Sequence, residues 1–189
     1  MKNKLLYIII LLFSCQPDED IVYNPTPYNI ATPYNFPEMN IPLDNPMTEE
    51  GVFLGRKLFH DNILSSDNTI SCSSCHIQNK AFSDGNQFSI GVNGSIGTRQ
   101  ASALINIGYN NFFDWSGGSN SLEEQISRPL FTNFEMNNSN WDEIINRLSN
   151  SEEYRELFHQ AFGECEIDSS QVKKAISQFE RILISSNSR

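Results

Sequence analysis

The feature that most constrains this chain is a run of five residues, Cys-Ser-Ser-Cys-His, at positions 72–76. Two cysteines that lie two residues apart on a tight turn can add their sulfurs to the two vinyl groups of one haem. The histidine that follows can then bind the iron from the same side. We therefore predict that Cys72 and Cys75 hold one covalent haem c, with His76 as an axial ligand of the iron, and that the fold surrounds this group.

Two other kinds of site also use closely spaced cysteines. A structural zinc site needs four ligands, and besides the motif the chain offers His60, His159 and Cys165, each placed singly. A thioredoxin-like redox pair is expected after a strand and needs no histidine behind it. Both alternatives stay open from the residues, although an export signal favours haem because haem attachment is an extracytoplasmic process in bacteria.

The N-terminus has the order of such an export signal. Lys2 and Lys4 precede the apolar run 5–13, which is too short to span a bilayer because a spanning helix needs roughly 20 apolar residues. Residues 12–15, Leu-Phe-Ser-Cys, resemble a bacterial lipoprotein cleavage site. We therefore predict a lipoprotein-type signal peptide over 1–15 that ends at a lipidated Cys15, with simple cleavage as the alternative. The expected location is the periplasm or the outer membrane of a Gram-negative bacterium, with the lipid anchor as the contact to the membrane.

The charge balance limits the partners of the chain. Acidic residues outnumber basic ones by 23 to 13, which gives a net charge of -10 at pH 7. Nucleic acid and anionic membrane surfaces repel such a protein, so we expect neither as a partner. A small neutral substrate or a basic electron carrier suits this charge better. The hydrophobic fraction of 39%, which includes 13 Phe, is enough for one packed core in 189 residues.

Proline marks the boundary of the folded domain. Seven of the eight prolines lie between Pro17 and Pro46. Because proline has no N–H group for helices or sheet ladders, we expect residues 16–45 to be a Pro-rich tether or a strap that lies on the domain. From Pro46 onwards the pattern is helical, without the alternation that indicates a sheet. We predict an all-α, cytochrome c-like haem domain over 46–189, with long loops around the haem.

The expected helices follow from caps and apolar stripes. The five expected helices run from Thr48 to about His60, from the capping box 121–124 to near Pro129, over the stripe 141–148, over 154–162 up to Gly163, and from Asp168 to about Leu183. In the first of them, Gly55 is expected to allow another backbone to approach. The stretch 61–97 is rich in Ser, Asn, Asp and Gly and is expected to be a long loop. Such a loop is uncommon unless it is functional, and this one surrounds the cysteine pair.

Several short motifs occur in a fixed order along the chain. They are Leu-Gly-Arg-Lys-Leu-Phe at 54–59, Ile-Ser-Cys-Ser-Ser-Cys-His at 70–76, Phe-Ser-Asp-Gly at 82–85, Gly-Thr-Arg at 97–99, Leu-Ile-Asn at 104–106, Trp115, Leu-Glu-Glu-Gln at 122–125, Pro129, Glu-Met at 135–136 and the stretch 175–183. In these motifs, residues 46–189 resemble the N-terminal haem domain of the bacterial di-haem cytochrome c peroxidases. That family also contains the methylamine-utilisation enzymes.

The resemblance implies a function and a set of site residues. In that family, hydrogen peroxide is reduced at the N-terminal haem with electrons from a second haem in a C-terminal domain. The resemblance implies that Gln125 and Glu135 line the distal pocket as catalytic groups, with Glu135 moving a proton and Gln125 orienting the peroxide. It implies that Trp115 is an electron-transfer contact of the haem. A cytochrome or another electron donor is the implied protein partner, and a homodimer is compatible with the resemblance.

The chain also departs from the family pattern. Many members carry a histidine sixteen residues after the haem-motif histidine, and Val92 stands at that position here, so we expect the distal face of the iron to be open or closed by water. Gln100 replaces the usual asparagine, which makes an interdomain calcium ion doubtful. Residues 116–118, Ser-Gly-Gly, replace Asp-Gly-Arg and are expected to remove an ion pair near the haem. The sequence ends at Arg189, where the family continues into the second haem domain.

The first functional hypothesis is therefore a c-type haem peroxidase domain that reduces hydrogen peroxide to water. The alternative is a mono-haem electron-transfer cytochrome without peroxidase activity. A third hypothesis is a relative that acts on a partner protein or an organic substrate.

Met39, Met47 and Met136 can ligate iron in principle, although methionine more often fills a core.

Overall fold

The computed structural model describes residues 23–187 with the exception of Trp115. Within this part of the chain the regular structure is helical, and strand-like pairing is limited to isolated bridges. The helices are α1 (Glu49–His60), α2 (Cys72–Cys75), α3 (Leu122–Phe131), α4 (Trp141–Ser149), α5 (Glu152–Phe162) and α6 (Ser169–Arg181). The prediction of an all-α domain is confirmed.

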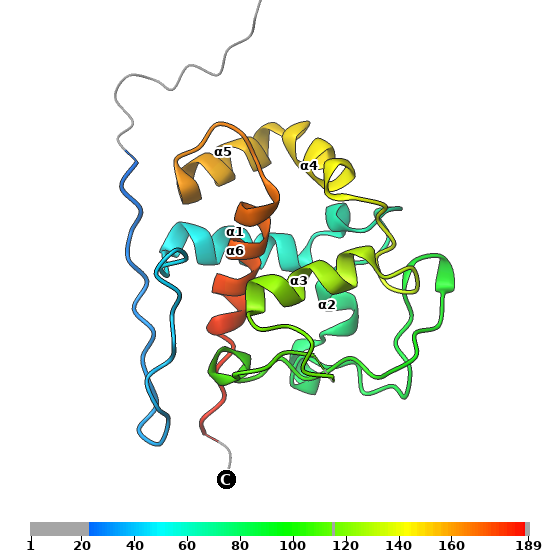
Figure 1. Cartoon of the computed structure of the whole chain (residues 1–189), viewed down its shortest axis with the longest axis horizontal. Helices are drawn as coiled ribbons and strands as arrows, with labels where there is room; N and C mark the ends of the chain where they lie inside the picture. Colours follow the sequence, from blue (N-terminus) through cyan, green and yellow to red (C-terminus); the bar gives the residue numbers. More distant parts are fainter. Residues whose placement is uncertain (1–22, 115, 188–189) are drawn as a thin grey trace, which may run out of the picture.

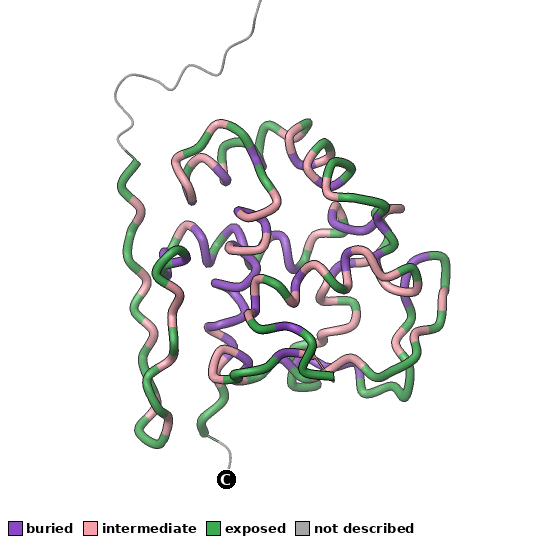
Figure 2. The backbone as a smooth tube through the Cα atoms, viewed as in Figure 1, coloured by how far each residue is buried: buried purple, intermediate pink, exposed green. Residues whose placement is uncertain are grey.

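The core lies where α1 crosses α6 (Figures 1 and 2). Leu58 and Phe59 of α1 are fully buried, and the Phe59 ring lies 5.1 Å from the ring of Phe179 on α6, measured between centroids. At Gly55 the two backbones touch, because an added Cβ would collide with the carbonyl oxygen of Ala175 and lie 2.6 Å from its carbon. The expectation that Gly55 allows another backbone to approach is confirmed.

Local capping explains where most of the helices begin. Thr48 accepts a hydrogen bond from the Gly51 N–H at 3.0 Å, and Asp168 accepts one from Gln171 at 2.8 Å, as the sequence predicts. Helix α3 differs from the prediction because it continues past Pro129 to Phe131. Proline removes one N–H from the helix, but the next turn still closes through a 3.1 Å bond from the Thr132 N–H to the Arg128 carbonyl. The helix therefore ends two residues later than the sequence suggested.

The stretch 61–97 is only partly the loop that its composition predicts. It contains α2 and three single turns of 3-10 helix, η1 (Asn62–Leu64), η2 (Gln78–Lys80) and η3 (Val92–Gly94). Short polar side chains support these turns; for example, the Asp61 side chain accepts a 2.9 Å bond from the Ile63 N–H at the start of η1. The segment is thus a series of fixed turns joined by extended chain.

The proline-rich segment lies along the helical body as a strap from Tyr23 onwards (Figure 1). The Tyr28 N–H donates to the Met47 carbonyl at 2.9 Å, and the Tyr23 hydroxyl donates to the carbonyl of Ala161 on α5 at 3.0 Å. The predicted signal peptide 1–15, with Cys15, lies outside the described residues. No helix in the range 23–187, as described, has the length and apolar character needed to cross a membrane.

A buried polar network joins the strap to three helices. Gln178 of α6 accepts a 3.0 Å bond from the Thr48 N–H and donates a 2.9 Å bond to Asn45. Asn45 in turn donates to Glu123 of α3 at 2.6 Å, and Arg181 forms a 2.7 Å ion pair with the same carboxylate. Because buried polar groups are costly unless they are paired, this network fixes how α1, α3 and α6 meet.

We predict that Gly55→Ala destabilises the domain by about 2 kcal/mol, because the added methyl group forces α1 away from the backbone of α6. The free energy of unfolding from a denaturant titration measures the effect. The matched control is Arg56→Ala on the exposed side of α1, which is expected to change the stability by less than about 0.5 kcal/mol. Equal stabilities for the two variants would show that the helices do not depend on this contact.

Candidate haem-binding site

The Cys-Ser-Ser-Cys-His run forms a single helical turn, α2. The Ser71 N–H donates to the Ser74 hydroxyl at 3.0 Å, and the His76 N–H donates to the Cys72 carbonyl at 2.9 Å, which closes the turn. Cys72 and Cys75 are three residues apart on a helix and therefore lie on the same face, as half-buried thiols that form no disulfide. Burial raises the pKa of both thiols.

His76 is held in one orientation by the loop that follows the turn. Its Nδ1 atom lies 2.8 Å from the Phe82 carbonyl oxygen, so Nδ1 carries the proton of the neutral ring and Nε2 keeps its lone pair. Burial lowers the pKa of His76, and this favours the neutral ring further. The arrangement suits a metal-binding histidine, because the bond to Phe82 fixes the tautomer and leaves the lone pair on Nε2.

A cavity of about 400 Å³ lies next to this turn. Cys72, Cys75 and His76 border it on one side, and residues of α3 and α6 contribute other parts of its wall. Apolar side chains such as Leu104, Ile107, Ile126, Leu130 and Ile176 line much of it. The volume is in the range of cofactor sites. Two thiols on one face, a histidine whose Nε2 keeps its lone pair and a largely apolar wall are the features that fit a c-type haem.

The structure brings Gln125 and Glu135 to the same cavity. The Gln125 Oε1 atom accepts a 3.0 Å hydrogen bond from the hydroxyl of Ser119. Glu135 is fixed through its backbone, since its N–H donates to the Thr132 carbonyl at 3.0 Å and its carbonyl accepts from the Val92 N–H at 2.9 Å. Burial raises the pKa of the Glu135 carboxyl, while the positive charge of Arg128 opposes the shift.

Other candidates from the sequence lie in different places. Trp115 falls outside the described residues. Met136 borders the cavity, whereas Met39 packs against Gly108 and Met47 lies under the strap. Across 23–187, leaving out position 115, no three His, Cys, Asp or Glu side chains gather in a way that could hold a metal ion.

An ion pair stands near the segment 116–118, where the sequence led us to expect the loss of one. The guanidinium of Arg128 on α3 pairs with the carboxylate of Asp114, and both residues border the cavity. Sequence reasoning missed this pair because its two members are fourteen residues apart, in a loop and a helix.

A buried carboxyl group in the cavity wall was also missed. Glu180 is only 7% exposed, and it borders the cavity from α6. Burial raises its pKa to about 8, although Arg181 opposes this shift. Glu180 lies four residues after Ile176 and therefore falls on the apolar stripe of its helix, where a carboxyl group is unusual. That position in the stripe was the signal that could have identified it.

A helical domain with a Cys-x-x-Cys-His turn on the wall of a cofactor-sized cavity defines the cytochrome c class of folds. Comparison with protein families makes the assignment narrower: the profile of the di-haem cytochrome c peroxidases matches residues 49–189, and the chain belongs to this family. Members of the family bind c-type haem.

Individual relatives agree with this assignment. The chain is 34% identical to the methylamine utilization protein MauG of Methylophilus methylotrophus, over 76% of the chain and 43% of that protein. It is also 34% identical to the cytochrome c peroxidase Ccp of Escherichia coli K12, over 82% of the chain and 33% of that protein. The chain thus spans less than half the length of these curated relatives.

Solved structures show the same fold. A MauG-like protein associated with microbial copper homeostasis matches with a TM-score of 0.78 and 38% identity, over 84% of this chain and 47% of that one. The di-haem peroxidase BthA of Burkholderia thailandensis matches with a TM-score of 0.64 and 21% identity, over 72% of this chain and 39% of that one, and supports the fold alone.

We predict that Glu180 makes the stability of the domain depend on pH. The folded-state pKa of about 8 lies above the ordinary value of 4.5, so below pH 4.5 the carboxyl is protonated in both states. As the pH rises from 4.5 to about 8 the unfolded chain releases this proton first, and folding loses up to about 1.4 kcal/mol per pH unit. Glu180→Gln removes this loss.

The measurement compares the unfolding free energies of the haem-loaded wild type and the Glu180→Gln variant from pH 5 to pH 8. The variant is expected to gain stability relative to the wild type as the pH rises. A stability difference that stays constant over this interval would contradict the buried, protonated state of Glu180.

Proposed function

We propose that this chain is a c-type haem peroxidase domain that reduces hydrogen peroxide to water. In this proposal Cys72 and Cys75 bind one haem through thioether bonds, and His76 Nε2 ligates its iron. Gln125 and Glu135 act on the distal side. The observation that carries the proposal is that these five residues, drawn from α2, α3 and the segment after α3, border one cavity.

The chemistry assigns a separate task to each distal residue. When bound, the haem would supply the iron at which the O–O bond breaks and would pass on electrons from the donor. Glu135 takes a proton from the oxygen of peroxide that approaches the iron and returns it to the oxygen that leaves as water. With two electrons and two protons, each peroxide yields two water molecules. Burial raises the Glu135 pKa towards neutrality, and this favours both the uptake and the return of the proton.

The electrons come from a second haem or from a separate cytochrome, and Trp115 is the proposed contact through which they reach the site. Within the 189 residues there is one Cys-x-x-Cys-His motif, whereas the relatives of the chain belong to a di-haem family. The net charge of -10 suits a basic donor protein. An interdomain calcium ion is not part of the proposal, because Gln100 stands where the resemblance leads us to expect asparagine.

We also propose that the chain is exported to the periplasm and anchored by lipidation of Cys15. The support is the charged, apolar and small-residue order of residues 1–15 together with the chemistry of haem attachment outside the cytoplasm. Mass spectrometry of the mature N-terminus tests this part of the proposal.

A second function, that of an electron-transfer cytochrome, is favoured by one observation. Met136 is 4% exposed and borders the cavity, so its thioether is available as a sixth iron ligand. A ferric spectrum that is high-spin and changes on addition of peroxide supports the peroxidase. A six-coordinate, low-spin spectrum that is indifferent to peroxide supports the electron carrier.

We predict that Glu135→Gln lowers peroxide turnover by at least about 100-fold, because the amide cannot accept the proton, while the ferric haem spectrum stays unchanged. Turnover with a chemical reductant and the absorption spectrum are measured on the same preparation. Glu164→Gln, at an exposed position between α5 and α6, is the control and is expected to retain full turnover. Unchanged turnover in Glu135→Gln would exclude this residue from the mechanism.

A further inference from the structure

Gln125 is the distal residue whose role depends on which end of its side chain faces the cavity. An amide group has an oxygen that accepts hydrogen bonds and a nitrogen that donates two. If the oxygen faces the iron, the site favours a ligand that donates. If the nitrogen faces the iron, the site favours a ligand that only accepts, such as an anion.

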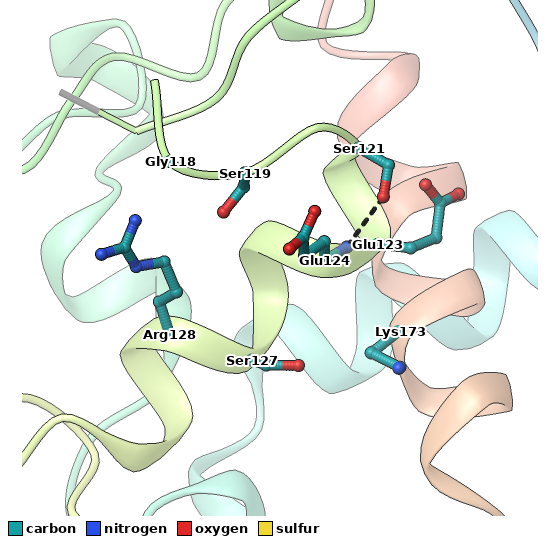
Figure 3. Close-up of a pocket in the computed structure, with 8 residues that line it drawn as sticks. All are labelled: Gly118, Ser119, Ser121, Glu123, Glu124, Ser127, Arg128 and Lys173. Atoms are coloured by element: carbon teal, nitrogen blue, oxygen red, sulfur yellow. Dashed lines mark hydrogen bonds between the residues drawn. The ribbon is translucent and has the colours of Figure 1, made fainter. Parts of the chain in front are cut away.

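In the structure, Ser119 is the hydrogen-bond partner of the oxygen end of this amide. Its hydroxyl donates to Gln125 Oε1 at 3.0 Å, so the acceptor end of the amide is already occupied. Ser119 borders the neighbouring surface pocket, and Figure 3 shows it on the segment that passes over α3. It therefore holds Gln125 from outside the cavity, which leaves the Nε2 donors for a ligand inside it.

Ser119 is itself held firmly. It is 1% exposed, and its carbonyl accepts a 3.2 Å hydrogen bond from the Phe113 N–H. A second contact ties the same segment to α3, because Asp114 pairs with Arg128. Gln125 and Arg128 are three residues apart and so lie on the same face of α3. The two contacts, Ser119 with Gln125 and Asp114 with Arg128, hold this face of α3 against the segment.

We propose that Ser119 is a positioning residue, which presets Gln125 as a hydrogen-bond donor towards small anionic ligands of the haem iron. This inference rests on the proposed function in one respect, namely that haem occupies the cavity with Gln125 on its distal side. It adds the ligand class to that function: small anions that can accept a hydrogen bond from Gln125 Nε2, of which the hydroperoxide anion would be one. Without the Ser119 hydroxyl, the amide loses the partner that holds its oxygen away from the cavity.

Fluoride is the probe that tests this assignment, because it binds ferric haem and accepts hydrogen bonds but cannot donate them. The experiment titrates the haem-loaded full chain with fluoride at one fixed pH. It records the dissociation constant and the visible charge-transfer band, whose position reports donors to the bound fluoride. Ser119→Ala is expected to weaken fluoride binding roughly threefold to tenfold, the effect of one hydrogen bond, and to shift the band in the same direction as Gln125→Leu.

A double-mutant cycle separates positioning from general damage to the fold. Ser119→Ala combined with Gln125→Leu is expected to bind fluoride as Gln125→Leu alone does, because Ser119 acts only through the amide. The matched control is Ser127→Ala, a serine of α3 that borders the same surface pocket in Figure 3, and it is expected to leave affinity and band unchanged. Covalent haem content by mass spectrometry shows that each variant is loaded.

The outcomes distinguish this inference from the function on which it rests. If Gln125→Leu weakens fluoride binding and Ser119→Ala does not, the role of Ser119 is overturned while Gln125 keeps its place in the distal pocket. If neither variant changes fluoride binding, both assignments are overturned. If Ser119→Ala behaves as expected in a chain that does not turn over peroxide, Ser119 positions Gln125 as proposed and the peroxidase function is the part that fails.

Discussion

The backbone contact between α1 and α6 is the constraint on which the rest of the structure depends. Since Gly55 has no side chain, the two helices approach until α1 meets the carbonyl group of Ala175. Helix α2 packs on α1, and α3 packs on α6, so the crossing also determines how far the Cys-x-x-Cys-His turn lies from Gln125. The network around Gln178 then prevents the helices from sliding past one another. The cavity is the space that this crossing leaves between α2, α3 and α6.

Burial favours the neutral forms of three ionisable groups in the cavity wall. It lowers the pKa of His76, raises that of Glu135 and raises that of Glu180 to about 8, so each group moves towards its neutral form. The neutral forms of these three groups are compatible with a large apolar cofactor, because charges without partners are costly in such surroundings. The charge of Arg128, at the rim of the cavity, opposes this trend at Glu135. A carboxylate at position 135 is therefore better tolerated than burial alone would allow.

Sequence reasoning succeeded where the physics is local and failed where two distant segments meet. The caps at Thr48 and Asp168 and the turn at 72–76 each depend on residues within four positions, so the pattern predicts them directly. The contact between Ser119 and Gln125 depends on how a loop passes over a helix. The spacing of apolar residues in the sequence does not predict such a path. The role of Glu180 could not be predicted from the apolar stripe in which it lies. Such a stripe indicates that a helix face is buried, but it does not indicate that the face borders a cavity.

Glu135 is held by a contact that involves the backbone of position 92 and not its side chain. At position 92, where the resemblance leads us to expect a histidine, the chain has a valine that is 1% exposed, yet the Val92 N–H still holds the Glu135 carbonyl at 2.9 Å. A backbone hydrogen bond does not depend on the side chain that its residue carries. Valine offers no side-chain ligand at this position, while its backbone N–H still fixes the Glu135 segment. Near segment 116–118 the contact is instead one between side chains, because Asp114 pairs with Arg128 of α3. This part of the cavity wall is therefore held in two ways, by backbone hydrogen bonds at Glu135 and by side-chain contacts at Gln125 and Arg128.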